Sequence, residues 1–241
     1  QSDARLDETV APPQKGQVLW LDIAGVHEVS LVEAVGQRFG LHPLVMEDIL
    51  NTAERPKFDD LGDTLYLVLK SLYYDPQQDE VVDEQISLVL GRGYVLSFQE
   101  SRGEDLENVR ERIRNGRGRI RAQGADYLLY AILDRIVDDY FVVLEKLGDR
   151  IEALEDELVQ NPRTQSLQAI YALKREMVTM RRVAWPLREV LGALQRMTPG
   201  AYALPASPEP LIQRGTAIYL RDLYDHTIHV LETVETFRDM L

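Results

Sequence analysis

The second half of the chain carries an apolar repeat that only long, paired helices can bury. From residue 125 to about residue 160, and again after Pro162, apolar side chains recur at alternating steps of three and four. This spacing places them in one stripe along an α-helix, as in a coiled coil. Helices of about 30 to 36 residues are roughly 45 to 54 Å long. Their stripes must therefore be buried against each other or against other subunits.

A third stripe follows a proline-rich break at residues 198–210 and continues to Leu241. Pro186 lies within the second stripe and is expected to bend or divide that helix. The three stripes consist of Ile136, Tyr140, Leu144, Leu147, Ile151, Leu154 and Leu158; of Ile170, Leu173, Met177, Met180, Ala184, Leu187, Leu191 and Leu194; and of Leu223, Thr227, Val230, Val234, Phe237 and Leu241. We therefore expect an antiparallel pair of long helices followed by a third long helix.

Before residue 124 the chain alternates short strand-like and helix-like segments. Strands are expected at residues 17–23, 63–75, 84–91 and 93–100, with a hairpin at 91–93, and helices at 28–40, from Pro43, and at 105–116. Residues 1–16 are polar and indicate a loose arm. The sequence thus predicts an α+β fold. A mixed α/β/α sandwich domain at 1–120 precedes a coiled-coil-like helix pair at 121–200 and the third long helix at 201–241.

Charge limits what the chain can bind. Asp and Glu total 40 against 27 Lys and Arg, a formal net charge of -13. Such a surface repels nucleic acid and attracts cations. The basic stretch at 110–121 has no aromatic residues for base stacking, so it is interpreted as a pairing surface for acidic neighbours. The absence of cysteine excludes disulfides and thiolate metal sites. No run of about 18 apolar residues is present to span a bilayer.

The long helices separate charge by sign. The first carries acids on roughly one face, namely Asp134, Asp138, Glu145, Asp149, Glu152 and Asp156, and the second carries Lys174, Arg175, Arg181, Arg182 and Arg188. We expect the two faces to neutralise each other partly across the hairpin. The chain still has a surplus of negative charge, and no basic partner for it is evident in the sequence.

Two groups of residues are candidates for metal ligation. Glu47 and Asp48 are adjacent within "HPLVMEDIL", which is otherwise apolar and helical. His226 and His229 are three residues apart and share a helix face with Asp222. That pair is typical either of a transition-metal site or of a polar helix face. No nucleophile or His–acid arrangement indicates an enzyme, which disfavours a metal-dependent hydrolase.

Several segments together closely resemble the CorA family of magnesium and cobalt transporters. They include "GLHPLVMEDILNTAERPKFDDLGDTLYLVLKSLYYD", "EQISLVLGRGYVLSFQE", "WPLREVL" and "RDLYDHTIHVLETVETFRDML", and the resemblance extends from about Val18 onward. It implies a cytoplasmic α/β domain with long helices, the last being a stalk helix that enters the membrane and lines a pore among five subunits. The family's Gly-Met-Asn signature and its two membrane spans do not occur in this sequence. The likeness thus implies a soluble cytoplasmic piece of a cell-membrane protein, with residues 201–241 as the N-terminal part of the stalk.

The resemblance also assigns metal ligands. It implies that Asp48 of one subunit and Asp222 of its neighbour form a principal divalent-cation site, with Glu47, Asp134 and His226 contributing to a second. Ala53 replaces a histidine that is frequent in the family, which leaves the composition of the second site open. Mg²⁺ suits carboxylates because it takes oxygen ligands and keeps several waters. Co²⁺, Ni²⁺ and Zn²⁺ remain alternatives.

The sequence therefore favours a metal-sensing and gating domain of a CorA-type divalent-cation channel, a homopentamer when complete, in which intersubunit Mg²⁺ stabilises the closed state. Two alternatives stay open: the cytoplasmic domain of a related zinc transporter, and a soluble scaffold that binds partners through its apolar stripes. Ion selectivity and transport direction are not determined by these residues.

Overall fold

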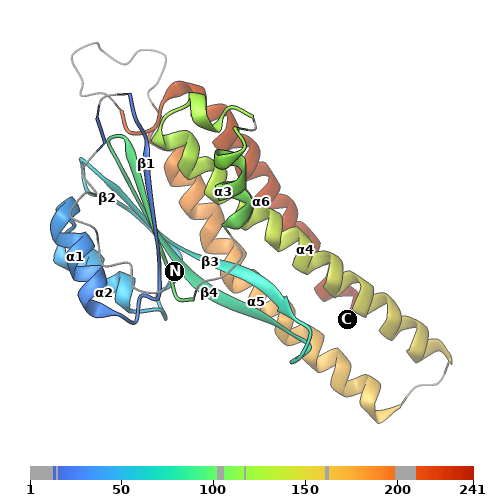
Figure 1. Ribbon diagram of the computed structural model, residues 1–241. Coiled ribbons are helices and arrows are strands. Elements are labelled where there is room, and N and C mark those ends of the chain that lie inside the picture. Colours follow the sequence, from blue (N-terminus) through green and yellow to red (C-terminus); the bar gives the residue numbers. More distant parts are fainter. Residues whose placement is uncertain (1–12, 15, 102–105, 117, 161–162, 199–209) are drawn as a thin grey trace.

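A five-stranded sheet lies between two sets of helices (Figure 1). The computed structural model describes residues 13–14, 16–101, 106–116, 118–160, 163–198 and 210–241. Two short helices cover one face of the sheet, and the long helices cover the other. Among the described residues no strand follows residue 125, which confirms the predicted change from mixed structure to long helices.

The sheet has the order β1-β5-β4-β3-β2. Its strands are β1 (Leu19–Ala24), β2 (Lys57–Asp60), β3 (Leu65–Asp75), β4 (Glu80–Gly91) and β5 (Tyr94–Gln99). β1 is parallel to β5, and all other neighbours are antiparallel. The predicted hairpin at residues 91–93 is present, and Gly93 has a φ of 83°, a conformation that glycine adopts without strain. Two features were not predicted, namely the edge strand β2 and the first four residues of β4.

The helices α1 (Val29–Phe39) and α2 (Pro43–Leu50) form the first helical layer. A left-handed Gly40 ends α1, and the His42 ring accepts a hydrogen bond from the Leu44 amide at the start of α2, with Pro43 as its first residue. Val45 and Ile49 of α2 are buried against the sheet. This anchoring fixes the direction in which the intervening acids, Glu47 and Asp48, leave the helix.

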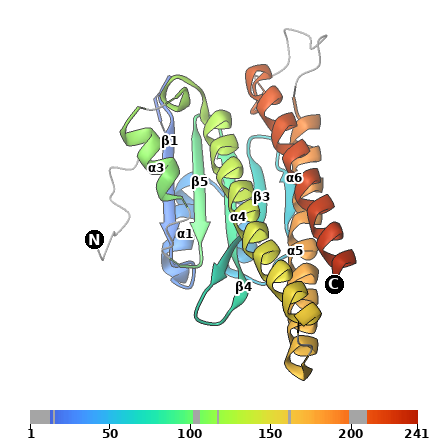
Figure 2. The ribbon, with the colours of Figure 1, turned by 90° about the vertical axis from the view of Figure 1, so that its right-hand side faces the viewer.

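The helices α3 (Glu107–Arg114), α4 (Ala125–Gln160), α5 (Thr164–Arg196) and α6 (Arg214–Met240) lie on the other face. α4 and α5 pack on the sheet, and α6 packs against both of them (Figure 2). Nearly all residues of the three predicted stripes are buried in one continuous core; Ile170, Leu158, Phe237 and Leu241 are half-buried at its margins. α5 continues as a single helix across Pro186, because Val183 and Leu187 on either side are both held in the core.

The expected neutralisation between α4 and α5 is not found. The basic residues of α5 pair elsewhere: Arg181 with Glu235 of α6, Arg182 with Asp83 of β4, and Arg188 with its neighbour Glu189. Within the described residues, no ion pair joins an acid of α4 to a base of α5. The reason is geometric, because the apolar stripes occupy the contact between the two helices and leave the charged faces outside it.

Candidate metal centre

The acid pair on α2 lies at the surface beside the edge strand β2. Glu47 is exposed, whereas the Asp48 side chain is 23% exposed. Asp48 Oδ2 is 2.7 Å from Lys57 Nζ, and the Asp48 backbone oxygen accepts a hydrogen bond of 3.1 Å from Gln85 Nε2. Asp48 therefore has a resident cationic partner and a fixed backbone, and Glu47 projects freely beside it.

The acid on α6 has a different environment. The side chains of Asp222 and His226 are 68% and 49% exposed, and His226 Nε2 lies 3.9 Å from Asp222 Oδ2. Leu223 and Thr227 are buried, which turns the polar residues outward. The His226 and His229 rings both approach Phe141 of α4, with centroid distances of 6.3 and 5.8 Å. Neither Lys nor Arg neutralises Asp222 within the described residues.

Asp134 of α4 lies near the same part of α6. Its carboxylate accepts a hydrogen bond of 3.2 Å from the Tyr130 hydroxyl. Burial, and then the neighbouring charge of Asp138, raise the pKa of Asp134, while the Tyr130 hydrogen bond, Arg112 and His226 act against that rise. An anion held in this environment is stabilised by any added cation.

The structure brings some of the predicted ligands together and separates others. Asp134, His226 and Asp222 gather on the α4–α6 side, whereas Glu47 and Asp48 lie on α2, across the sheet (Figure 1). A single chain therefore does not unite Asp48 with Asp222. In the part of the chain that the structure describes, no three His, Asp or Glu side chains are arranged to hold a metal. Ala53, just beyond α2, is exposed and offers no side-chain ligand.

Lys57 is the neighbour that sequence reasoning missed. It lies nine residues after Asp48, beyond a turn and at the start of the unpredicted strand β2. The residues of β2, Lys-Phe-Asp-Asp, show no apolar alternation that would have predicted a strand. The preceding Pro56 was the only available indication, because proline in sheets occurs mainly at edge strands and strand starts.

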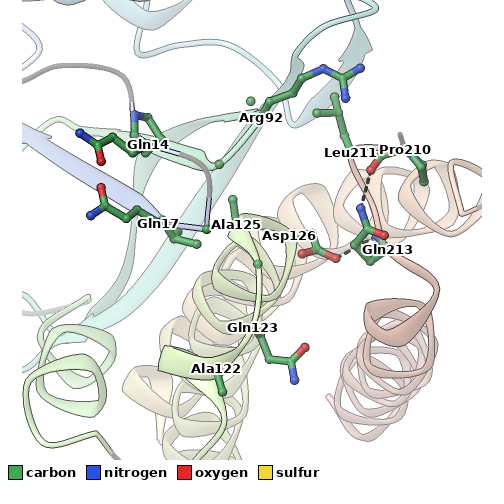
Figure 3. A pocket seen from close by; sticks show the side chains of 16 residues that line it. Gln14, Gln17, Arg92, Ala122, Gln123, Ala125, Asp126, Pro210, Leu211 and Gln213 are labelled. Atoms are coloured by element: carbon green, nitrogen blue, oxygen red, sulfur yellow. Dashed lines mark hydrogen bonds between the residues drawn. The ribbon is translucent and has the colours of Figure 1, made fainter. Parts of the chain in front are cut away.

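A pocket of about 590 Å³ lies apart from these residues, between the start of β1, the β4–β5 hairpin and the first turns of α4 and α6 (Figure 3). In it the buried Asp126 carboxylate accepts a hydrogen bond of 2.9 Å from the Gln213 amide, and Gln213 Nε2 donates to the Pro210 carbonyl at 2.8 Å. The pocket contains none of the predicted ligands. The one buried acid in the pocket, Asp126, accepts a hydrogen bond from the residue that precedes α6. Asp126 therefore joins the start of α4 to the start of α6.

No helix in the described ranges contains a stretch that is long and apolar enough to cross a membrane. The chain is 47% identical over 222 residues to the "Cobalt/magnesium transport protein CorA" of Thermotoga maritima, covering 92% of this chain and 60% of that protein. The chain thus spans about three fifths of that relative's length.

Solved structures agree in fold. The soluble domain of CorA from Methanocaldococcus jannaschii superimposes with a TM-score of 0.75 at 20% identity, covering 92% of this chain and 84% of that one. The cytoplasmic domain of ZntB from Vibrio parahaemolyticus superimposes with a TM-score of 0.72 at 13% identity, covering 92% of this chain and 82% of that one. The sequence profile of the family described as "CorA-like Mg2+ transporter protein" matches residues 15–241. This is a transporter family, not an enzyme family, and the chain belongs to it.

Proposed function

We propose that this chain is the cytoplasmic metal-sensing and gating region of a CorA-type divalent-cation channel. Mg²⁺ bound between neighbouring subunits stabilises the closed state. The observation that carries the proposal is the placement of two surface acids, Asp48 and Asp222, on helices at opposite sides of one chain. The relative in Thermotoga maritima, whose printed name is that of a cobalt and magnesium transport protein, supports the choice of ions.

Acids on opposite sides suit a ring of identical subunits. In a head-to-tail ring each subunit presents one surface to one neighbour and a different surface to the other. α2 of one subunit then faces α6 of the next, and every interface brings Asp48 close to Asp222. A hydrated divalent cation links such carboxylates without needing a complete protein cage, because Mg²⁺ retains several waters.

The electrostatic cost of an empty interface is large enough to act in gating. Two like charges about 4 Å apart repel by about 4 kcal/mol at an effective dielectric constant near 20. Moving a two-state equilibrium from 1:99 to 99:1 takes about 5.5 kcal/mol. Lys57 reduces this repulsion at each Asp48, so the shift toward an open ring depends on several interfaces losing Mg²⁺ together. Intracellular Mg²⁺ would then close the channel when supply is ample, by mass action.

Asp134 and His226 form the basis of a second site, completed by Glu47 of a neighbouring subunit. The imidazole of His226 near Asp222 also favours a second candidate function, transport of Zn²⁺, because nitrogen and oxygen ligands suit zinc. The scaffold alternative has little support, because the apolar stripes that would bind partners are buried within the chain itself.

The test uses the full-length protein with the double substitution Asp48→Asn and Asp222→Asn. Mg²⁺ should no longer protect this variant from proteolysis, and the channel should stay open at Mg²⁺ concentrations that close the parent. The matched control is Asp149→Asn with Asp156→Asn, which also removes two negative charges. Both of these acids are exposed near the C-terminal end of α4. Normal Mg²⁺ protection and normal closure in the first variant would show that Asp48 and Asp222 are ordinary solvated acids.

A further inference from the structure

The Lys57–Asp48 ion pair is held in place on both sides. Gln85 binds the backbone of Asp48, and Lys57 pairs with Val68 in the β2–β3 ladder. The ammonium group also lies 5.9 Å from the centre of the Tyr66 ring. The Lys57 side chain is only 33% exposed. These contacts distinguish the pair from the loose surface ion pairs that contribute little to stability.

The surroundings keep Lys57 positively charged. Burial alone lowers its pKa, but the hydrogen bond and negative charge of Asp48, followed by the charges of Asp59 and Glu54, raise it overall. The ammonium therefore lies near three carboxylates, those of Asp48, Asp59 and Glu54, and satisfies part of their attraction for cations. A divalent ion that approaches Asp48 therefore meets an ammonium group already paired with it.

We propose that Lys57 is a built-in competitor of the divalent cation at Asp48, and that its displacement sets the Mg²⁺ concentration at which the intersubunit site fills. This inference rests on the proposed function, because it concerns the same site. When Mg²⁺ is scarce, Lys57 neutralises Asp48. When Mg²⁺ is abundant, the hydrated ion takes the carboxylate and the ammonium moves toward Glu54 and Asp59.

Coulomb's law gives the expected size of the competition. An ammonium roughly 6 Å from a doubly charged ion weakens its binding by about tenfold, even when the dielectric constant is that of water. A less polar surrounding makes the effect larger. Asp222 has no such competitor among the described residues, so the regulation comes from the α2 side of the interface.

The experiment titrates Mg²⁺ against full-length protein and follows protection from proteolysis. Lys57→Met removes the charge and keeps most of the side-chain length, and its midpoint should fall about tenfold in Mg²⁺ concentration. Lys57→Arg keeps the charge and should stay near the parent. Lys146→Met removes one positive charge from an exposed position on α4 and is the matched control. Without divalent cations, Lys57→Met should melt at a lower temperature than the parent, and added Mg²⁺ should narrow or reverse that difference.

Each outcome is informative. If Lys57→Met leaves the midpoint unchanged or raises it while Asp48→Asn abolishes protection, Lys57 is merely a structural partner, and the proposed function stands. If Asp48→Asn leaves Mg²⁺ protection intact, the proposed site itself fails, and the role of Lys57 fails with it. If Lys57→Met does not assemble, Lys57→Gln carries the same expectation, because it keeps a hydrogen-bond donor but loses the charge.

Discussion

The acids on α2 and α6 both lie at the surface, but only the acid on α2 has a resident cation. Asp48 is half-buried, hydrogen-bonded through its backbone and neutralised by Lys57. Asp222 is largely exposed, and its neighbour is a histidine at 3.9 Å. Asp48 is therefore neutralised before any metal binds, whereas Asp222 carries an uncompensated charge. Bringing copies of α6 together around an axis would therefore add repulsion between Asp222 side chains unless a cation lies between them.

The largest effect should come from giving α6 a cation of its own. In the full-length protein, Asp222→Lys places an ammonium where the bridging ion is expected, so Asp48 of the neighbour gains a permanent partner. An opposite-charge contact of about 4 Å contributes about 4 kcal/mol at a dielectric constant near 20. Resistance to proteolysis should then become independent of Mg²⁺. An Asp222→Lys protein that still needs Mg²⁺ for protection would place the ion elsewhere.

Removing the imidazole separates hard ions from transition metals. His226→Gln should weaken Co²⁺ or Zn²⁺ binding by about tenfold and change Mg²⁺ binding little, because imidazole nitrogen suits the former and oxygen ligands suit Mg²⁺. Isothermal titration of each ion measures the difference. His229→Gln is the control on the same helix. Equal losses for Mg²⁺ and Zn²⁺ would argue against a direct nitrogen ligand.

Loosening the backbone of α2 should have a smaller effect. Gln85→Ala removes the hydrogen bond to the Asp48 carbonyl and leaves a void at a side chain that is 2% exposed. The free energy of unfolding should fall by about 1 kcal/mol, the usual contribution of one such bond. Urea denaturation of this chain measures it. A neutral result would mean that the position of Asp48 is fixed by Val45 and Ile49 alone.

The smallest effect is a pH dependence on the α6 side. Because the pKa of Asp134 is raised in the folded chain, the folded state binds its proton more tightly than the unfolded state does. Its contribution to stability is present at pH values below the unfolded pKa and is lost as the pH rises through the folded pKa. In Asp134→Asn the melting temperature should vary less with pH between the unfolded and folded pKa of Asp134, and Asp149→Asn, which removes an exposed acid of the same helix, is the comparison. A parent slope of opposite sign would contradict the burial of Asp134.

The long helices were predictable because their signal is redundant. Each stripe repeats over many turns, so a single irregular residue such as Pro186 does not obscure it. β2 was missed because four residues with three charges carry no period, and its pairing depends on β3. The domain boundaries at 120 and 200 remain a prediction, because the same core extends from Leu65 of β3 to Val234 of α6.

The candidate site was predictable only in part. The sequence singled out Glu47 and Asp48 as adjacent acids, and Asp222 only as sharing a face with the histidines of the last helix. The association of Asp48 with Asp222 came from the family resemblance, since no spacing within one chain connects α2 to α6. The Lys57–Asp48 contact depends on the path of the turn between α2 and β2, which local propensities do not determine. The expected charge neutralisation between α4 and α5 was wrong for a similar reason. The signs of the charges on two helices do not determine which helix faces come into contact.

The parallel pairing of β1 with β5 has a consequence for the order of folding. Leu19 pairs with Tyr94, so the first strand of the chain has no partner until the last strand of the sheet has been synthesised. Local hairpins close quickly and distant pairings slowly, so β3, β4 and β5 should associate first and β1 should join them late. The two tryptophans report on different steps. Trp20 of β1 donates a hydrogen bond to Ser97 of β5, whereas Trp185 lies on α5. In refolding, the Trp20 fluorescence should therefore change in a slower phase than that of Trp185.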